Sequence, residues 1–446
     1  MAKRQFETDA GGQDVATSVL EERPQQEEAT PVEADAARIS RMISQLGRIG
    51  GGNDGSVSRL AFTEDERRAH ALVGDWLGEI GLTVRADAVG NLIAELPGSA
   101  RSSGWIGVGS HLDSVPNGGR FDGIVGVVGA VELARLLIAR KVSLRHGLRV
   151  IAFAGEEGAR FGEPCIGSKA AVGLLGPRDL DRIHDGKGTT LREAFLGIGL
   201  DPAAIPAARW RQEEWSAFLE LHIEQGSTLY REGIPIGVVD MVSGSTRLLI
   251  DLQGRADHSG ATPMHERADA LAAAAEAIVA IENLVRDPRH HGTRVTVGYL
   301  EVEPNSITTI PGRVRFSVDV RDIDHERQRE TALALLRVTQ AVSEKRLVTM
   351  RVDPLADTAP SVLPTWLRGL AVEACRNLEV PYRVLSSGAS HDSQIVNTLV
   401  PTAILFVPSR EGLSHVPQEW TSSADIAKGV EVLCETLVRV DQVVDP

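Results

Sequence analysis

Histidine and carboxylate residues occur together in several short motifs along this chain, and this pairing could bind metal. The first motif is Ser-His111-Leu-Asp113, which directly follows an apolar stretch. A carboxylate at this spacing can hold the second N–H of the imidazole, which fixes the tautomer and raises the basicity of a metal-binding histidine. By itself the motif more often marks a structural histidine beside a surface acid.

Single and paired carboxylates follow. Asp122 lies in Asn-Gly-Gly-Arg-Phe-Asp-Gly, where glycines let the backbone approach closely and aim one side chain. Its two oxygens could bridge two cations about 3.5–4 Å apart. Asp122 could also cap the following helix, and this role is compatible with bridging. Glu156 and Glu157 are adjacent after an apolar run. Adjacent acids are costly unless a cation is near, so one could bind metal while the other serves as general base and acid.

Two further histidines complete the set. His222 lies in Leu-His-Ile-Glu-Gln-Gly, and His391 lies far downstream in Ala-Ser-His-Asp-Ser. Each alone is more often structural than functional. Together the motifs give a mixed nitrogen and oxygen donor set that suits Zn²⁺, Mn²⁺, Co²⁺ or Ni²⁺.

The elements expected around these motifs alternate between strand and helix. We predict strands over 105–109 and 148–154 with a buried helix over 123–140 between them. This is the βαβ pattern of a mostly parallel sheet, which binds ligands at the carboxyl ends of its strands. Upstream, Thr63 and Glu66 have the spacing of a reciprocal capping box at the start of a helix.

The sequence pattern of a mostly parallel sheet ends at about residue 242. Alternating and apolar stretches predict a β-α-β-β-α-β order, typical of a small sheet covered on one face. Its predicted strands cover 247–252, 294–300, 313–320 and 347–352, and its helices cover 269–285 and a segment ending near 344. From about 357 the chain returns to the first pattern, with a helix over 366–376, a strand over 402–407 and a helix over 425–440.

We therefore expect an α/β protein with an inserted α+β, ferredoxin-like domain. Residues 36–242 and 357–446 form the larger domain and residues 243–356 the inserted one. Residues 1–35 have little to bury, lack the apolar segment of a signal peptide, and are expected to be a disordered acidic leader.

Composition restricts the classes of partner. The 446 residues carry a formal net charge of −14, which disfavours binding to nucleic acid. No stretch approaches the roughly 18 apolar residues of a membrane-spanning helix. The three cysteines are widely spaced, which favours a reducing cytoplasm over a disulfide framework.

The motif series resembles a known family. GSHLDSVPNGGRFDG, AGEEGARFG, LHIEQG, GRADHSGATPM and SHDS occur in the order found in the metal-dependent carbamoylase branch of the M20 peptidase-like hydrolases. That branch includes N-carbamoyl-L-amino-acid hydrolases, β-ureidopropionases, and allantoate and ureidoglycolate amidohydrolases. The resemblance runs from about residue 36 to the C-terminus.

The resemblance implies roles for individual residues. It implies two divalent metal ions per subunit, with Asp122 bridging them. Glu156 matches the general base of the family, and Asp113 matches the acid beside the first histidine ligand. The implied metal ligands are His111, Asp122, Glu157, His222 and His391.

The inserted domain would be a lid and dimerisation domain. His258 matches a histidine that reaches the active site of the partner subunit in a homodimer. Gln225 and Arg321 match substrate-binding positions, and a planar guanidinium suits a substrate carboxylate. Many relatives carry asparagine where this chain has Thr308, while Asn305 is present but is not clearly its equivalent, so substrate identity is less defined than reaction type.

These implications give a first hypothesis of function. We expect metal-dependent hydrolysis of an N-carbamoyl C–N bond, with an N-carbamoyl-L-amino acid as the small-molecule substrate. Allantoate and ureidoglycolate carry the carboxylate that Arg321 requires and stay as alternatives. An aminoacylase or dipeptidase of the same architecture, and a non-catalytic metal-binding homologue, are less favoured, because the branch motifs and Glu156 are present.

Overall fold

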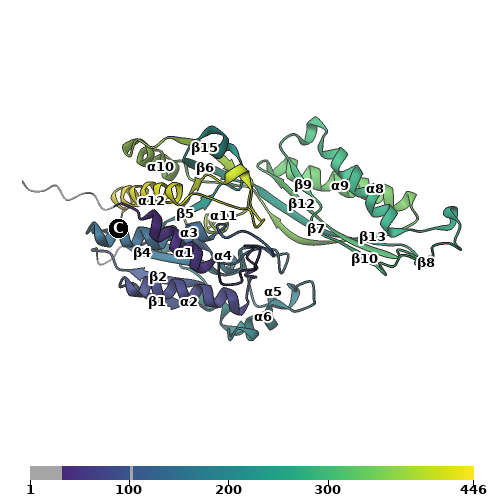
Figure 1. The fold of residues 1–446 in the computed structure, drawn as a ribbon, viewed down its shortest axis with the longest axis horizontal. Coiled ribbons are helices and arrows are strands. Elements are labelled where there is room, and N and C mark those ends of the chain that lie inside the picture. Colours follow the sequence, from purple (N-terminus) through teal and green to yellow (C-terminus); the bar gives the residue numbers. More distant parts are fainter. Residues whose placement is uncertain (1–32, 101–103, 446) are drawn as a thin grey trace, which may run out of the picture. The chain divides into compact units, whose positions relative to one another are not determined.

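The computed structural model describes residues 33–100 and 104–445, and Figure 1 shows how their helices and strands are arranged. The predicted leader over 1–35 lies almost wholly outside the described residues. Among the described residues, no helix is both long and apolar enough to cross a membrane.

A nine-stranded sheet forms the larger part of the structure. Its strand order is β1-β2-β4-β3-β5-β16-β6-β14, with β15 beside β6. The four central strands β4-β3-β5-β16 are parallel, as predicted. The strands are β1 (Thr83–Ala86), β2 (Leu92–Leu96), β3 (Trp105–His111), β4 (Gly147–Phe153), β5 (Trp215–Ile223), β6 (Ile236–Val242), β14 (Ser361–Val362), β15 (Tyr382–Ser387) and β16 (Thr402–Val407).

Helices pack on both faces of this sheet. The central strands are buried along their length, which matches their continuous apolar sequences. One apolar core joins the sheet to α1 (Ala36–Leu46), α2 (Glu64–Glu79), α3 (Ile124–Ala139), α10 (Thr365–Asn377) and α12 (Ser423–Val443). The remaining helices of this part are short: α4 (Ile166–Ala171), α5 (Asp179–Arg182), α6 (Leu191–Gly197), η1 (Pro202–Ala208), η2 (Gln212–Glu214), α7 (Thr228–Glu232), α11 (Asp392–Val396) and η5 (Arg410–Gly412).

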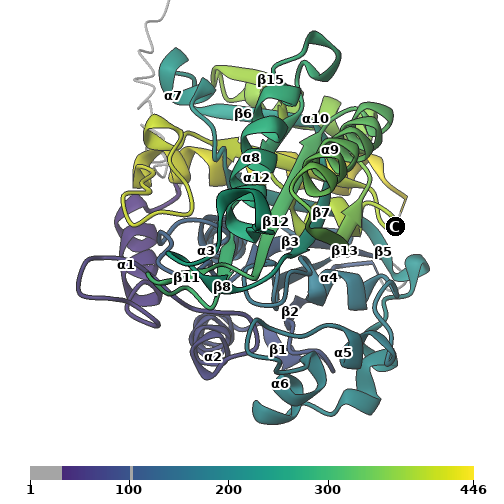
Figure 2. The same ribbon diagram turned by 90° about the vertical axis from the view of Figure 1, so that its right-hand side faces the viewer.

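A second, antiparallel sheet has the order β10-β12-β7-β13, with β9 also paired to β12. It is built from β7 (Gly244–Gln253), β9 (Arg294–Thr296), β10 (Leu300–Glu303), β12 (Arg313–Asp322) and β13 (Thr349–Thr358). Helices α8 (Ala270–Val285) and α9 (His325–Lys345) share one apolar core with it and lie together on one face (Figure 2). The predicted β-α-β-β-α-β order is present except that the second predicted strand is divided into β9 and β10.

Short elements complete the second part. Strands β8 (Asp257–His258) and β11 (Thr309–Ile310) form a separate ribbon, and η3 (Met264–Glu266) and η4 (Pro288–His290) flank α8. The boundaries at 243 and 357 stay a prediction, and β13 continues to Thr358, past the second of them.

Three local predictions were wrong. The strand expected over 294–300 is divided into β9 and β10, which pair with different parts of β12. The strand expected over 347–352 starts two residues later, because Leu347 has a left-handed backbone (φ 57°) after α9. The reciprocal capping box is half formed: Thr63 caps the amide of Glu66, but the Glu66 carboxylate accepts from the amides of Phe62 and Gly155.

Candidate active site

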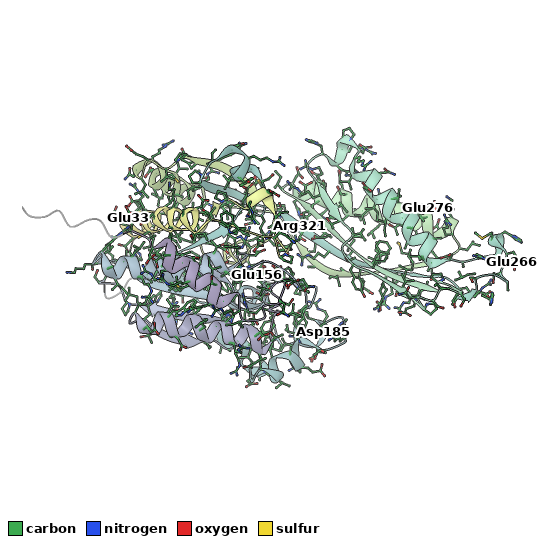
Figure 3. The ribbon with its side chains drawn as sticks, in the orientation of Figure 1. Glu33, Glu156, Asp185, Glu266, Glu276 and Arg321 are labelled. Carbon is green, nitrogen blue, oxygen red and sulfur yellow. The ribbon has the colours of Figure 1, made fainter. Side chains whose placement is uncertain are left out.

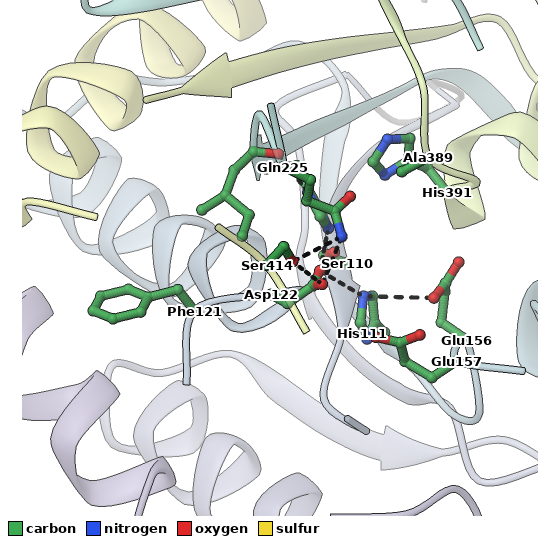
Figure 4. Close-up of polar contacts among 12 residues, drawn as sticks. Ser110, His111, Phe121, Asp122, Glu156, Glu157, Gln225, Ala389, His391 and Ser414 are labelled. Atoms are coloured by element: carbon green, nitrogen blue, oxygen red, sulfur yellow. Dashed lines mark hydrogen bonds and ion pairs between the residues drawn. The ribbon is translucent and has the colours of Figure 1, made fainter. Parts of the chain in front are cut away.

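The predicted motifs meet at one edge of the nine-stranded sheet. His111 ends β3, Glu156 and Glu157 follow β4, and His222 lies near the end of β5. Because these strands are parallel, their carboxyl ends share an edge. Asp122 reaches the same place from the loop before α3 (Figure 4).

One potential metal-binding group consists of three buried side chains, His111, Asp122 and His222. Their ligand atoms lie within 4.8 Å of one another. Oδ1 of Asp122 lies 3.2 Å from Nε2 of His222 and 3.8 Å from Nε2 of His111. Burial would raise the pKa of Asp122, but its contacts with His222 and His415 hold that pKa well below its usual range.

A second group uses the other oxygen of Asp122. Nε2 of His415 lies 3.1 Å from Oδ2 of Asp122 and 3.2 Å from Oε1 of Glu157, and the ligand atoms of all three lie within 4.8 Å. Glu157, followed by Asp122, raises the pKa of His415 to about 11. Each oxygen of Asp122 therefore faces a different group, as expected for a bridging carboxylate.

His415 was missed by the sequence analysis. It lies in an irregular loop after β16, where it has a left-handed backbone (φ 61°). The available signal was topological, because β16 is parallel to β5 and its following loop must reach the same edge.

His391 lies apart from the group that contains Glu157. Its Nε2 is 2.7 Å from the hydroxyl of Ser387, and its ring centre is 4.5 Å from that of His222. Its ligand atom is within 4.8 Å of those of Glu220 and His222. Burial and the nearby His222 hold its pKa well below the usual range. The ligand role predicted for His391 stays a prediction.

Glu156 is buried beside the first group, with Oε2 3.7 Å from Nε2 of His111. Burial is the main reason that its pKa is raised to about 7. The Cys165 thiol, itself buried, donates to Oε1 of Glu156 at 3.3 Å. A carboxyl group with a pKa near neutrality can both accept and return a proton.

Asp113 holds the loop that carries the two glutamates. Its carboxylate oxygens accept from the amides of Glu156 and Glu157, each at 2.9 Å. Oδ1 also lies 3.4 Å from Nδ1 of His111. Burial alone would lower the pKa of His111, but Asp113 and the neighbouring acids outweigh it and hold that pKa well above its usual range.

The predicted substrate-binding residues are divided between two places. The Gln225 amide donates to Oδ2 of Asp122 at 2.6 Å, so it contacts the site directly. Arg321, labelled in Figure 3, lies on β12 of the second sheet. Its guanidinium donates to Asp319 at 3.0 Å and to the carbonyl of Gly388 at 3.3 Å.

The other two predicted substrate-binding residues, and the predicted catalytic His258, lie elsewhere. His258, Asn305 and Thr308 are exposed on or beside the β8–β11 ribbon. This ribbon follows the C-terminal end of β7, which is ten residues long. Ser245, the residue paired with Arg321, lies at the N-terminal end of the same strand. At about 3.3 Å per residue, the length of β7 places the ribbon about 30 Å from Arg321.

The residues present fit a pair of divalent cations. The site has imidazole nitrogens and carboxylate oxygens in two groups that share Asp122. Within the described part of the chain, the only basic side chains paired with Asp122, Glu156 and Glu157 are histidines. Buried carboxylates at this density favour bound cations.

The chain is similar to several known proteins. Residues 107–439 match the model of peptidase family M20/M25/M40. The chain is 40% identical over 406 residues to N-carbamoyl-L-amino acid amidohydrolase of Geobacillus stearothermophilus, covering 91% of this chain and 98% of that protein. It is 32% identical over 403 residues to allantoate amidohydrolase of Bacillus subtilis strain 168, covering 90% and 97%. A solved structure of AtUAH in complex with glyoxylate superposes with a TM-score of 0.89 at 32% identity, covering 92% and 99%.

Proposed function

Since the chain belongs to peptidase family M20/M25/M40, we propose that it is a dinuclear metal amidohydrolase acting on an N-carbamoyl-L-amino acid. The products would be the amino acid, carbon dioxide and ammonia. The observation that carries this proposal is the placement of Asp122, whose two oxygens face two histidine-containing groups beside a buried Glu156. The relative at 40% identity supports the substrate class.

The proposed ligands are His111 and His222 for one metal and Glu157 and His415 for the other, with Asp122 shared. His391 is the alternative to His415 that the sequence suggested. When bound, the two cations would supply an acidified water and a Lewis acid for the carbonyl oxygen of the substrate. Zn²⁺, Mn²⁺, Co²⁺ and Ni²⁺ all suit this donor set.

Glu156 would move the proton in this reaction. Its pKa of about 7 allows it to take a proton from the attacking water and to pass it to the departing nitrogen. Asp113 would position Glu156 through the backbone of the loop.

Arg321 would hold the carboxylate of the substrate, since its planar guanidinium suits two parallel hydrogen bonds. Gln225 would contact the substrate beside Asp122. His258 lies about 30 Å along the sheet from Arg321, so we propose that it acts on the oxyanion of a second subunit in a homodimer. Asn305 and Thr308 would then also reach the substrate across the dimer. We further propose a cytoplasmic location, supported by three unpaired cysteines.

Allantoate and ureidoglycolate are the main alternative substrates, since each carries a ureido group and a carboxylate. The relatives at 32% identity include both an allantoate amidohydrolase and ureidoglycolate hydrolases, which supports both alternatives equally. An aminoacylase or dipeptidase reaction is a weaker alternative.

A substrate panel tests the proposal. Metal-loaded enzyme would be given N-carbamoyl-L-amino acids, N-carbamoyl-β-alanine, allantoate, ureidoglycolate and an N-acetyl-L-amino acid, with ammonia or acetate release as the readout. We expect ammonia from N-carbamoyl-L-amino acids. Turnover confined to the acetyl compound would contradict the proposal and indicate an aminoacylase.

A further inference from the structure

Two arginines lie opposite each other on neighbouring strands of the five-stranded sheet. The β12–β9 register pairs Arg321 with Arg294. Opposite residues on antiparallel strands point to the same face and have Cβ atoms about 4.5–5.5 Å apart. That face is the one without helices, because Val318 and Val320, which alternate with Asp319 and Arg321, are buried in the core under α8 and α9.

Both guanidinium groups reach the loop that carries His391. Arg321 donates to the carbonyl of Gly388, three residues before that histidine. Nη1 of Arg294 lies 3.2 Å from the point where a Cβ would stand at Gly388. A third guanidinium, that of Arg247, lies against Gly158 on the glutamate loop, where a Cβ would collide with it. These arginines therefore face the candidate active site.

The charges of this cluster are not balanced. Asp319 is 3.0 Å from Arg321 and 3.6 Å from Arg247. Over residues 33–100 and 104–445, it is the one carboxylate paired with these two arginines, and Arg294 has no carboxylate within 4 Å. Like charges directly opposite on a sheet are destabilising. Three guanidinium groups against one carboxylate form a site for added negative charge.

One substrate carboxylate satisfies Arg321 and leaves Arg294 with no anion. We propose that Arg294 binds a second carboxylate, so that the preferred substrates are N-carbamoyl derivatives of acidic L-amino acids. This inference rests on the proposed function and specifies its substrate class. Arg294 is exposed and supplies specificity, whereas Arg321 supplies the contact common to all substrates.

The test compares isosteric substrates. N-carbamoyl-L-glutamate and N-carbamoyl-L-glutamine differ at the side-chain terminus by one charge. We expect wild-type enzyme to favour the glutamate compound by at least about tenfold in kcat/KM, which corresponds to about 1.4 kcal/mol. Arg294→Gln should abolish this ratio and leave kcat/KM for the glutamine compound nearly unchanged.

Arg351→Gln is the matched control. Arg351 pairs with Asp251 across β13 and β7, which places it on the same helix-free face as Arg247. It is exposed and has its own partner, Asp353, at 3.0 Å. This variant should keep the wild-type ratio.

A binding measurement supports the kinetics. L-glutamate, a product of the proposed reaction, should raise the Tm of metal-loaded wild-type enzyme more than L-glutamine does. Arg294→Gln should remove that difference.

Three outcomes would overturn the inference. Equal turnover of both carbamoyl compounds by the wild type would contradict it while leaving the proposed function intact. An equal loss for both compounds in Arg294→Gln would mean that Arg294 and Arg321 share one carboxylate. If the enzyme at full metal content hydrolysed none of the carbamoyl compounds, the proposed function would be wrong as well.

Discussion

Nε2 of His415 lies 3.1 Å from Oδ2 of Asp122, while Oδ1 of the same carboxylate faces His222 at 3.2 Å. On this relationship we propose that His415 binds the second metal. We predict that His415→Ala retains about one metal per subunit and loses more than about 100-fold in kcat, because even residues that only support ligands contribute 10–100-fold. Metal analysis of the purified variant gives the measurement.

His391→Ala is the informative comparison for this prediction. If His391 completes the second site, its variant loses the metal and His415→Ala keeps two. His265→Ala serves as control, since His265 is 81% exposed.

Glu156→Gln should keep both metals and lose about 10²–10⁴-fold in kcat, the range typical of general acid–base groups. The amide has a similar shape but does not accept the proton. Turnover near the wild-type rate at full metal occupancy would contradict the role of Glu156.

Cys165→Ala should lower kcat by less than about tenfold at unchanged metal content, since one weak donor to Glu156 is removed. Cys165→Ser restores a donor and should recover most of the rate. Cys375→Ala is the control, because Cys375 is also buried but lies in the core between sheet and helices. Equal losses in the alanine and serine variants would indicate a packing role.

Much of this site followed from the sequence, because a histidine or acid directly after an apolar run is placed by the strand itself. His111, Glu157 and His222 follow this rule, and the parallel order of their strands brings them to one edge. His415 does not follow it, since it lies in the irregular loop beyond the end of β16. The pairing of Arg294 with Arg321 depends on sheet register, which the residue pattern of one strand does not specify.

Glu66 shows a second reason why a prediction from the sequence can be wrong. Its spacing from Thr63 predicts a local capping box, but tertiary structure uses the carboxylate to hold the amide of Gly155, next to Glu156. Burial, followed by the charge of Asp113, raises the pKa of Glu66 to about 8.

A stability prediction follows from this shift. The folded chain keeps a proton on Glu66 that the unfolded chain releases near the ordinary glutamate pKa of 4.5. Glu66 therefore contributes stability below that pH, and the contribution is lost as pH rises toward about 8. Metal-free wild-type protein should lose free energy of unfolding over this window more steeply than Glu66→Gln, by up to about 1.4 kcal/mol per pH unit.

Denaturant unfolding at several pH values measures this difference. Glu64→Gln, at an exposed position of the same helix, is the control. Parallel pH profiles for wild type and Glu66→Gln would contradict the shifted pKa.

His258 should act across the dimer. Glu156→Gln and His258→Ala should each be inactive alone. Mixed dimers contain one active site with both residues intact, so random reassembly at equal amounts should restore roughly a quarter of wild-type activity. No recovery, with mixed dimers demonstrated by mass, would place His258 outside the active site.

The most direct test of the central claim is a metal titration followed by ammonia release from an N-carbamoyl-L-amino acid. Chelator-stripped enzyme would receive zero to three equivalents of Mn²⁺ per subunit. We predict no ammonia without metal and a rate that saturates at two equivalents, matching the two groups that share Asp122. Undiminished ammonia release from fully stripped enzyme, or saturation at one equivalent, would contradict it.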